Sequence, residues 1–379
     1  MKRVILLGSS GSIGQSACKV ARALPDRMKI VGMAVHSSAD ILRKQMEEFN
    51  PKAVAITDEN AAQKFSPPSC RFYKGEEGLT RLVEETEADL VLVAIVGTSG
   101  LKPALAALKA GKDLAVASKE ILVMAGEIVM ATARENGRLI LPVDSEHNAI
   151  FQCLQGARHE HVRRLILTAS GGPFRKTPEA ELARVTVEQA LRHPTWKMGK
   201  KITIDSATLF NKGLEMIEAR WLFDVDIARV EVCVHPESIV HSMVEFVDRS
   251  VLAQMSRSDM CFPIQYAVTY PERVEGDLPR LDLAKLGKLT FEEPDHTRFP
   301  ALRLARQAGE DGGALPAVFN AANEVAVEKF LAGQSSFPKI WETVETVMNA
   351  HQKIASPSLF DILEADSWAR RQARQQYPS

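Results

Sequence analysis

The chain has 379 residues, of which 45% are hydrophobic and 25% charged, and its formal net charge is −1. This composition predicts an ordinary globular protein of two or three domains, and the near-neutral charge gives no broad basic footprint for nucleic acid or an anionic membrane. Five scattered cysteines without Cys-x-x-Cys spacing argue against a disulfide framework or a zinc knuckle. With no leader and no apolar run of about 20 residues, we expect a cytoplasmic protein that binds neither nucleic acid nor membrane.

The first predicted strand, residues 3–7, leads into a glycine-rich turn and then a helix. The glycines Gly8, Gly11 and Gly14 follow a G-x-x-G-x-x-G spacing rather than G-x-G-x-x-G. A helix start carries unpaired N–H groups and a partial positive charge, which suit a pyrophosphate, and glycine lets the backbone approach it. Further donors are the hydroxyl groups of Ser9, Ser10 and Ser12. The alternative is a turn without a ligand, because such motifs give false positives.

The second predicted strand, residues 29–35, favours NADP over NAD. Dinucleotide folds that bind NAD place a carboxylate near the end of this strand, on the ribose 2′-hydroxyl. Here the strand runs into His36, Ser37 and Ser38, and the first carboxylate is Asp40. The segment can donate hydrogen bonds to a 2′-phosphate without repelling it.

Residues 1–150 alternate strand and helix patterns. The predicted strands cover residues 3–7, 29–35, 53–57, 89–95, 113–117 and 139–143, and helical patterns between them include 101–110 and 119–135. Continuous apolar strands separated by helices predict a parallel sheet covered on both faces, an α/β doubly wound Rossmann-type domain that binds NADPH.

The pattern changes after residue 150. Predicted strands cover residues 163–168, 201–205, 230–234, 239–247 and 251–255, with a hairpin turn at 248–250. We expect an α+β domain with an antiparallel part over 151–275 and a linker over 276–300. Helical patterns at 302–308, 314–331, 340–350 and 360–376 predict a C-terminal helical bundle over 301–379.

Asp144 and Glu146 lie two residues apart after the sixth predicted strand. In extended backbone this spacing points both carboxylates to one face, at the sheet edge where ligands bind. Hard oxygen ligands on one face suit Mg²⁺ or Mn²⁺. The alternative is a solvated turn in which Glu146 caps the next helix.

A third carboxylate, Glu215, follows on a predicted helix that Ser206 is expected to cap. Asn211, Lys212 and Glu215 are three or four residues apart, so their side chains converge. We expect Ser206, Asn211 and Lys212 to hold a phosphate and Glu215 to face the metal. An exposed helix face is the alternative.

Two other segments suggest ligand contacts. The turn Ser170-Gly171-Gly172 combines a hydroxyl with a flexible hinge, and the long basic stretch 192–201 contains one aromatic residue, Trp196, as a lid would. Lys119 and Glu120, after the fifth strand, face the same sheet edge as Asp144. The alternative for the long stretch is an ordinary surface loop, and the alternative for Lys119 is a surface lysine at a helix start. The histidines of the segment His235–Phe246 lack zinc spacing and read as sheet or interface residues.

Long segments of the chain together resemble the 1-deoxy-D-xylulose 5-phosphate reductoisomerase family. The blocks, in the order of that family, are "GSSGSIG", "AIVGTSGL", "ASKE", "PVDSEHNAIFQ", "SGGPFRKTP", "RHPTWKMGKKITIDSATLFNKGLEMIEARWLF", "HPESIVHSMV" and "NAANEVAV". The resemblance implies a homodimeric oxidoreductase that uses NADPH and Mn²⁺ or Mg²⁺. It implies rearrangement and reduction of the phosphorylated ketose 1-deoxy-D-xylulose 5-phosphate to 2-C-methyl-D-erythritol 4-phosphate, in the non-mevalonate route to isoprenoid precursors.

The resemblance assigns roles residue by residue. The implied metal ligands, also counted as catalytic together with Lys119, are Asp144, Glu146 and Glu215. The implied substrate-binding residues are Lys119, Ser145, Glu146, Ser170, His193, Trp196, Ser206, Asn211, Lys212 and Glu215. The expected cofactor-binding residues are Gly8, Ser10, Gly11, Ser12, Ile13, His36, Ser37, Ser38, Ser118, Glu120 and Gly199. His36-Ser37-Ser38 stands where relatives often have Gly-Lys-Asn, so a lysine for the 2′-phosphate is missing.

Two other functions fit parts of the pattern. A semialdehyde or homoserine dehydrogenase would share the dinucleotide domain, yet it needs neither three carboxylates nor a phosphate grip. A dinucleotide-sensing protein would bind NADPH without turnover. Metal dependence and turnover of the ketose phosphate separate the three hypotheses.

Overall fold

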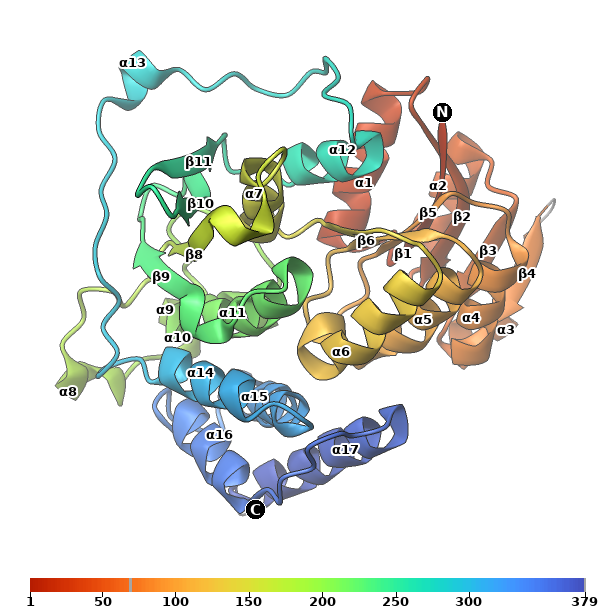
Figure 1. The fold of residues 1–379 in the computed structure, drawn as a ribbon. Coiled ribbons are helices and arrows are strands. Elements are labelled where there is room, and N and C mark those ends of the chain that lie inside the picture. Colours follow the sequence, from red (N-terminus) through yellow and green to blue (C-terminus); the bar gives the residue numbers. More distant parts are fainter. Residues whose placement is uncertain (68–69, 378–379) are drawn as a thin grey trace. The chain divides into compact units, whose positions relative to one another are not determined.

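A computed structural model describes residues 1–67 and 70–377 (Figure 1). The chain divides into two compact units. The N-terminal unit comprises residues 1–121, 127–148 and 259–280, and the C-terminal unit comprises 122–126, 149–258 and 281–379.

The N-terminal unit is built on a seven-stranded parallel sheet with the order β4-β3-β2-β1-β5-β6-β7. Its strands are β1 (Lys2–Leu7), β2 (Met28–Val35), β3 (Ala53–Ile56), β4 (Arg71–Lys74), β5 (Leu90–Val93), β6 (Asp113–Val116) and β7 (Ile140–Pro142). Every residue of β3 and β5 is buried, as continuous apolar strands require when helices cover both faces of a sheet. The predicted doubly wound α/β fold is confirmed.

Six of these strands match predicted strands, and the seventh, β4, was missed. Its sequence, Arg-Phe-Tyr-Lys, has charged ends, and Tyr73 alone among its four residues is fully buried. β4 is an edge strand, and its pairing with β3 rather than an apolar run defines it. Sequence periodicity carries little signal for such a strand.

Helices follow the strands of the first half of the chain. They are α1 (Ser12–Ala23), α2 (Ala39–Phe49), α3 (Glu59–Gln63), α4 (Gly75–Glu85), α5 (Leu101–Lys109), α6 (Glu120–Glu135) and α7 (Ser145–Cys153). A later helix, α12 (Cys261–Thr269), returns to this unit and packs against α1, where the Cys261 thiol lies 3.8 Å from the Ser16 carbonyl oxygen.

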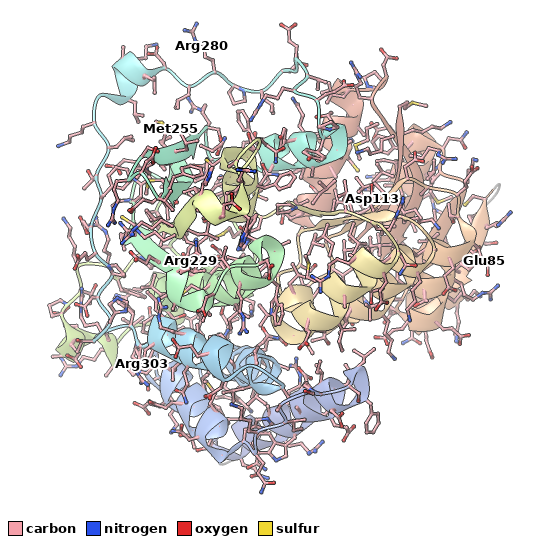
Figure 2. All side chains as sticks on the ribbon, viewed as in Figure 1. Glu85, Asp113, Arg229, Met255, Arg280 and Arg303 are labelled. Atoms are coloured by element: carbon pink, nitrogen blue, oxygen red, sulfur yellow. The ribbon has the colours of Figure 1, made fainter. Side chains whose placement is uncertain are left out.

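The C-terminal unit contains a four-stranded mixed sheet with the order β11-β10-β8-β9. Its strands are β8 (Val162–Ala169), β9 (Val230–Val234), β10 (Val240–Phe246) and β11 (Val251–Met255). β10 and β11 form the predicted hairpin, and Arg249 in its turn has a φ of 73°. Figure 2 adds the side chains, with Arg229 directly before β9 and Met255 at the end of β11.

Helices make up most of the remaining C-terminal unit. They are α8 (Glu179–Leu182), α9 (Val187–Ala190), α10 (Lys200–Thr208), α11 (Phe210–Phe223), α13 (Leu283–Leu286), α14 (Ala301–Asp311), α15 (Leu315–Leu331), α16 (Lys339–Ala350) and α17 (Leu359–Gln375). Among the described residues, the short 3-10 helices are η1 (Thr98–Gly100), η2 (His159–His161) and η3 (Ile227–Arg229). The last four α-helices confirm the predicted C-terminal helices. One of them, α15, packs on α11 through aromatic rings, with those of Phe319 and Phe210 5.2 Å apart.

One predicted strand is wrong. Residues 201–205 lie in α10, although Ile202 and Ile204 alternate with polar residues. Ile204 and Ala207 are fully buried, and Lys201 forms an i,i+4 ion pair with Asp205. Packing on the core and helical pairing therefore override the period-two pattern.

Over the ranges 1–67 and 70–377, no helix combines the length and the apolar character that crossing a membrane requires.

Candidate active site

The glycine-rich turn joins β1 to α1 in the N-terminal unit. Gly11 is the N-cap of α1, and no side chain caps this helix start within the described residues. Gly14 is buried beneath the turn, where a Cβ atom would lie 2.3 Å from the Gly8 carbonyl oxygen and 2.5 Å from the Ser9 Cα. The turn folds back so tightly on the helix that this position admits only glycine. The result is a helix start whose N–H groups are open to an anion.

The serines of the turn differ from one another. The Ser9 hydroxyl is buried and donates to the Gln45 Oε1 at 2.7 Å, while the Gln45 amide donates back to the Ser9 carbonyl at 2.9 Å. Ser9 therefore ties the turn to α2, and its predicted role as a phosphate donor is wrong. Ser12, in contrast, is exposed at the start of α1, where a donor can reach a ligand.

The segment after β2 presents polar donors without a carboxylate. His36 and Ser37 are exposed, and the His36 Nδ1 lies 2.9 Å from the Thr57 hydroxyl. Ser38 is the N-cap of α2. Farther along the sheet, the Ser118 hydroxyl donates to the Ile95 carbonyl, which orients Ser118 at the end of β6. Glu120 begins α6 and is buried.

Lys119 and Asp144 form a buried ion pair at 2.7 Å, with side chains 7% and 11% exposed. Asp144 follows β7, and Lys119 directly precedes α6. Burial alone would raise the pKa of Asp144, but the Lys119 ammonium outweighs it, aided by His147, and the net effect lowers this pKa far below its usual value. Asp144 is therefore a carboxylate at any physiological pH.

Asp144 and Glu146 lie close together, although not for the predicted reason. Ser145 begins α7, so Glu146 is in the first turn of a helix and not in extended backbone. The Glu146 N–H donates to Asp144 at 3.3 Å, and the two side chains bring carboxylate oxygens within 4.8 Å of each other. The Ser145 hydroxyl donates to Glu146 at 2.6 Å. Two hard oxygen donors at this separation fit a divalent cation.

In the C-terminal unit, two serine hydroxyl groups lie beside one imidazole. The His193 Nε2 lies 3.0 Å from both the Ser170 and the Ser206 hydroxyl oxygens. The backbone N–H groups of Thr195 and Trp196 donate to the His193 Nδ1 at 3.2 and 2.9 Å. Because Nδ1 accepts, the hydrogen of the neutral ring sits on Nε2 and points to the two hydroxyl groups.

Burial lowers the pKa of His193 to about 4, so the ring is neutral near pH 7. One imidazole N–H and two hydroxyl groups then converge without a formal charge. Such a set can bind the oxygens of a phosphate by hydrogen bonds.

α10 and α11 place the remaining predicted ligands. Ser206 lies inside α10 and is not an N-cap as predicted; the helix breaks at Leu209, which has a φ of 63°, and α11 begins at Phe210. The Asn211 amide donates to Glu215 at 2.6 Å, and the Lys212 ammonium pairs with the same carboxylate. Lys212 and Glu215 are only 4% and 1% exposed, so the alternative of an exposed helix face is wrong.

Residues 192–199 of the predicted lid segment lie between α9 and α10 without regular secondary structure, and residues 200 and 201 begin α10. Trp196 is partly buried, with its ring 6.3 Å from that of His241, and the Thr195 and Ser238 hydroxyl oxygens are 3.2 Å apart. Gly199, a predicted cofactor contact, is exposed as the N-cap of α10.

The histidines discounted as metal ligands are indeed held within the fold. The His235 Nδ1 contacts the Thr290 carbonyl at 2.8 Å, its Nε2 accepts from the Ile239 N–H, and the His241 Nε2 lies 3.2 Å from the Ser256 carbonyl. These bonds fix loops and strands, as expected of sheet residues.

Comparison with known proteins extends these observations over the whole chain. Family models match residues 4–126 (1-deoxy-D-xylulose 5-phosphate reductoisomerase), 140–223 (the C-terminal domain of the same enzyme) and 255–372 (DXP reductoisomerase C-terminal domain). A 1-deoxy-D-xylulose 5-phosphate reductoisomerase of Pelotomaculum thermopropionicum is 52% identical over 98% of this chain and 97% of its own length. The chain belongs to the 1-deoxy-D-xylulose 5-phosphate reductoisomerase family.

Solved structures of the family are similar over their full length. The enzyme from Zymomonas mobilis, in complex with NADPH, has a TM-score of 0.93 and 42% identity, covering 100% of this chain and 99% of its own. A DOX-P reductoisomerase in complex with NADPH, fosmidomycin and magnesium has a TM-score of 0.92 and 39% identity, covering 100% of this chain and 98% of its own.

Sequence reasoning missed one contact of α10, the helix that carries Ser206. Asn323, in α15, donates to the buried Asp205 of α10 at 2.9 Å. Asn323 lies within the block "NAANEVAV", which supported the reductoisomerase resemblance without suggesting a role. Two asparagines in an otherwise apolar helical stretch are the signal that was available.

Proposed function

We propose that the protein is a 1-deoxy-D-xylulose 5-phosphate reductoisomerase in which the residues described above perform the recognised activity of the family. It rearranges 1-deoxy-D-xylulose 5-phosphate and reduces the product with NADPH to 2-C-methyl-D-erythritol 4-phosphate, an oxidoreductase step in the non-mevalonate route to isoprenoid precursors. The observation that carries this function is the family match along nearly the entire chain.

NADPH binds to the N-terminal unit in this proposal. The open start of α1 receives the pyrophosphate at Ser10, Gly11, Ser12 and Ile13, and Gly8 and Gly14 shape the turn. The donors of His36, Ser37 and Ser38 receive the 2′-phosphate, and the first two are exposed. The other proposed cofactor contacts are Ser118, Glu120 and Gly199. The NADPH bound to the Zymomonas mobilis relative supports NADPH as the cofactor.

Asp144, Glu146 and Glu215 are the proposed ligands of a divalent cation, Mg²⁺ or Mn²⁺. The separation of Asp144 and Glu146 supports this assignment, as does the magnesium in three related structures. Asp144 stays ionised beside Lys119, and Glu215 is held by Asn211 and Lys212. When bound, the cation supplies Lewis-acid polarisation of the substrate carbonyl.

The protein's own side chains bind and orient the substrate. Ser170, His193 and Ser206 donate to the phosphate, and Asn211 and Lys212 complete the grip. Binding energy at this remote group orients the carbon skeleton for reaction. Lys119 and Ser145 bind the polar end of the substrate, and Trp196 on the 190–199 loop excludes water from it.

The proposed domains are the NADPH-binding domain over 1–150, the catalytic and dimerisation domain over 151–275, the linker over 276–300 and the helical bundle over 301–379. We place the protein in the cytoplasm as a homodimer, with no nucleic-acid or membrane partner. The exposed edge strand β11 supports a second copy as the partner, because Val251 and Leu252 are about half exposed there. Sedimentation of the wild type and of V251E/L252E tests this.

Oxidation of NADPH with 1-deoxy-D-xylulose 5-phosphate tests the function. Chelator should abolish turnover and Mn²⁺ should restore it, whereas E215Q should keep NADPH binding and lose most of kcat. The exposed Glu328→Gln on α15 is the control and should behave as wild type. Full activity without metal would support a different dehydrogenase, and NADPH binding without turnover would support a sensing protein.

A further inference from the structure

Helix α10 carries Ser206 and is short, nine residues between Gly199 and the break at Leu209. Its position sets the distance between Ser206 and the other two phosphate donors, Ser170 and His193. What fixes α10 therefore fixes the geometry of the whole cluster.

The turn that carries Ser170 rests directly on α10. A Cβ atom at Gly172 would lie 2.9 Å from the Ala207 Cα and 2.9 Å from the Ser206 carbonyl oxygen. The backbone of the turn is therefore in contact with the backbone of α10 beside Ser206. Any shift of α10 changes this contact and the spacing of the two serines.

A buried hydrogen bond connects α10 to α15. Asp205, 1% exposed, precedes Ser206; its Oδ1 accepts from the Asn323 amide at 2.9 Å, and its Oδ2 contacts the Lys201 ammonium at 2.6 Å. Asn323 itself is fully buried in α15. A buried carboxylate needs its donors, so this link determines how α10 lies on α15.

We propose that Asn323 is a positioning residue for phosphate recognition, acting through Asp205 on Ser206. The inference rests on the proposed function, because it takes Ser170, His193 and Ser206 as the phosphate donors. Without the Asn323 amide, the Asp205 carboxylate loses a buried donor and must turn toward its remaining partners. α10 turns with it, and Ser206 leaves the position in which it meets His193.

The matched control lies one turn earlier on the same helix. Asn320 is also fully buried, but its amide donates to Glu324 of α15 at 3.1 Å and not to α10. N323A and N320A remove the same side chain from the same helix, and only N323A removes a bond to α10.

We expect N323A to raise the KM for 1-deoxy-D-xylulose 5-phosphate and the Ki of the phosphonate fosmidomycin about tenfold, with kcat at saturation largely kept. N320A should lower the Tm about as much as N323A does, yet leave both constants within about twofold of wild type. The exchange variant D205N/N323D, which swaps donor and acceptor, should recover most of the lost affinity.

Equal KM values for N323A and N320A would overturn the proposal, and so would an exchange variant no better than N323A. If N323A does not fold, N323S, which keeps a hydroxyl donor at this position, is compared with N320S by the same criteria. S206A is assayed in parallel. If S206A leaves the KM unchanged, the proposed phosphate grip itself fails; if S206A raises it and N323A matches N320A, only the positioning role fails.

Discussion

Each of the two units of the protein contains one proposed anion site, and the two sites are built from different parts of the chain. In the N-terminal unit the site is backbone: the turn between Gly8 and Gly14 and the open start of α1. In the C-terminal unit the proposed site consists of side chains. The Ser170 and Ser206 hydroxyl oxygens each lie 3.0 Å from the His193 Nε2.

The difference decides where each site is vulnerable. A backbone site depends on the shape of the main chain, so its sensitive positions are glycines that admit no Cβ. A side-chain site depends on rotamers and on the elements that hold them, so its sensitive positions include partners that never touch the ligand. The four predictions below test this contrast in turn.

The largest effect is expected in the backbone site, at Gly14. In G14A the new Cβ would meet the Gly8 carbonyl oxygen and the Ser9 backbone, neither of which can move without opening the turn. We expect NADPH affinity to fall on the order of a hundredfold, since overpacking against backbone is costly. Fluorescence titration with NADPH measures it.

Gly11 provides the matched control for Gly14. A Cβ atom at Gly11 meets the Gly8 carbonyl oxygen at an ordinary 3.4 Å, and the residue has a φ of −73°. G11A should therefore fold with a Tm close to wild type. Equal Tm losses in G11A and G14A would contradict the account of the turn.

The next effect concerns the two nitrogens of His193, which serve different partners. H193N keeps an acceptor at the Nδ1 position for the Thr195 and Trp196 N–H groups but removes the distal donor. H193Q keeps the distal donor and removes the near acceptor. We expect H193N to raise the KM for 1-deoxy-D-xylulose 5-phosphate about tenfold, as the loss of a hydrogen bond to a charged group implies.

H193Q should instead keep more substrate affinity than H193N, because it keeps the distal donor. It should also make the loop of residues 193–199 more mobile, because the Thr195 and Trp196 N–H groups lose their acceptor. Limited proteolysis should therefore cleave this loop faster in H193Q than in H193N. The two variants thus separate phosphate binding from loop support. If both raise the KM equally and leave proteolysis unchanged, the assignment of the two nitrogens is wrong.

The same contrast explains what the sequence could predict. Six of the seven strands of the parallel sheet and the glycine turn are local patterns, and the ends of these strands were predicted to within two residues. Ser206 was misassigned as a helix cap and residues 201–205 as a strand, because α10 is defined by its packing on α15 and by the break at Leu209. Asp144 and Glu146 were paired correctly by their spacing, although a helix start rather than a strand brings them together.

Long-range partners were beyond a reading of one sequence. The bond between Asn323 and Asp205 joins residues 118 positions apart, and neither residue has a local signal for the other. The Ser9–Gln45 bond is a similar case, and it removed one predicted phosphate donor. Resemblance to the reductoisomerase family supplied His193 and Ser145, for which the spacing alone gave no role.

A smaller effect, on the preference for NADPH over NADH, is expected after β2. There the proposed cofactor contacts are side chains and not backbone. Ser37 is exposed, and the segment lacks a carboxylate before Asp40. S37D should lower the ratio of kcat/KM for NADPH to that for NADH about fivefold, because a carboxylate repels the 2′-phosphate across partly screened solvent. The isosteric but uncharged S37N is the control and should stay near wild type. A ratio that is the same in S37D and S37N would place the 2′-phosphate elsewhere.

The smallest effect is a pH dependence of stability that belongs to the side-chain site. Burial lowers the pKa of His193 to about 4 in the folded protein, against about 6.5 in the unfolded chain. Between these values the unfolded state binds more protons, so this contribution to the free energy of unfolding is complete above pH 6.5 and is lost as the pH falls toward 4. Because His193 is only partly buried, we expect a loss on the order of 1 kcal/mol. Urea unfolding of wild type and of H193N, in buffer without phosphate or substrate, should show the steeper decline in wild type, since asparagine does not titrate. Parallel declines over this range would mean that the imidazole is as well solvated in the folded chain as in the unfolded one, and its role as a neutral donor would then need a different cause.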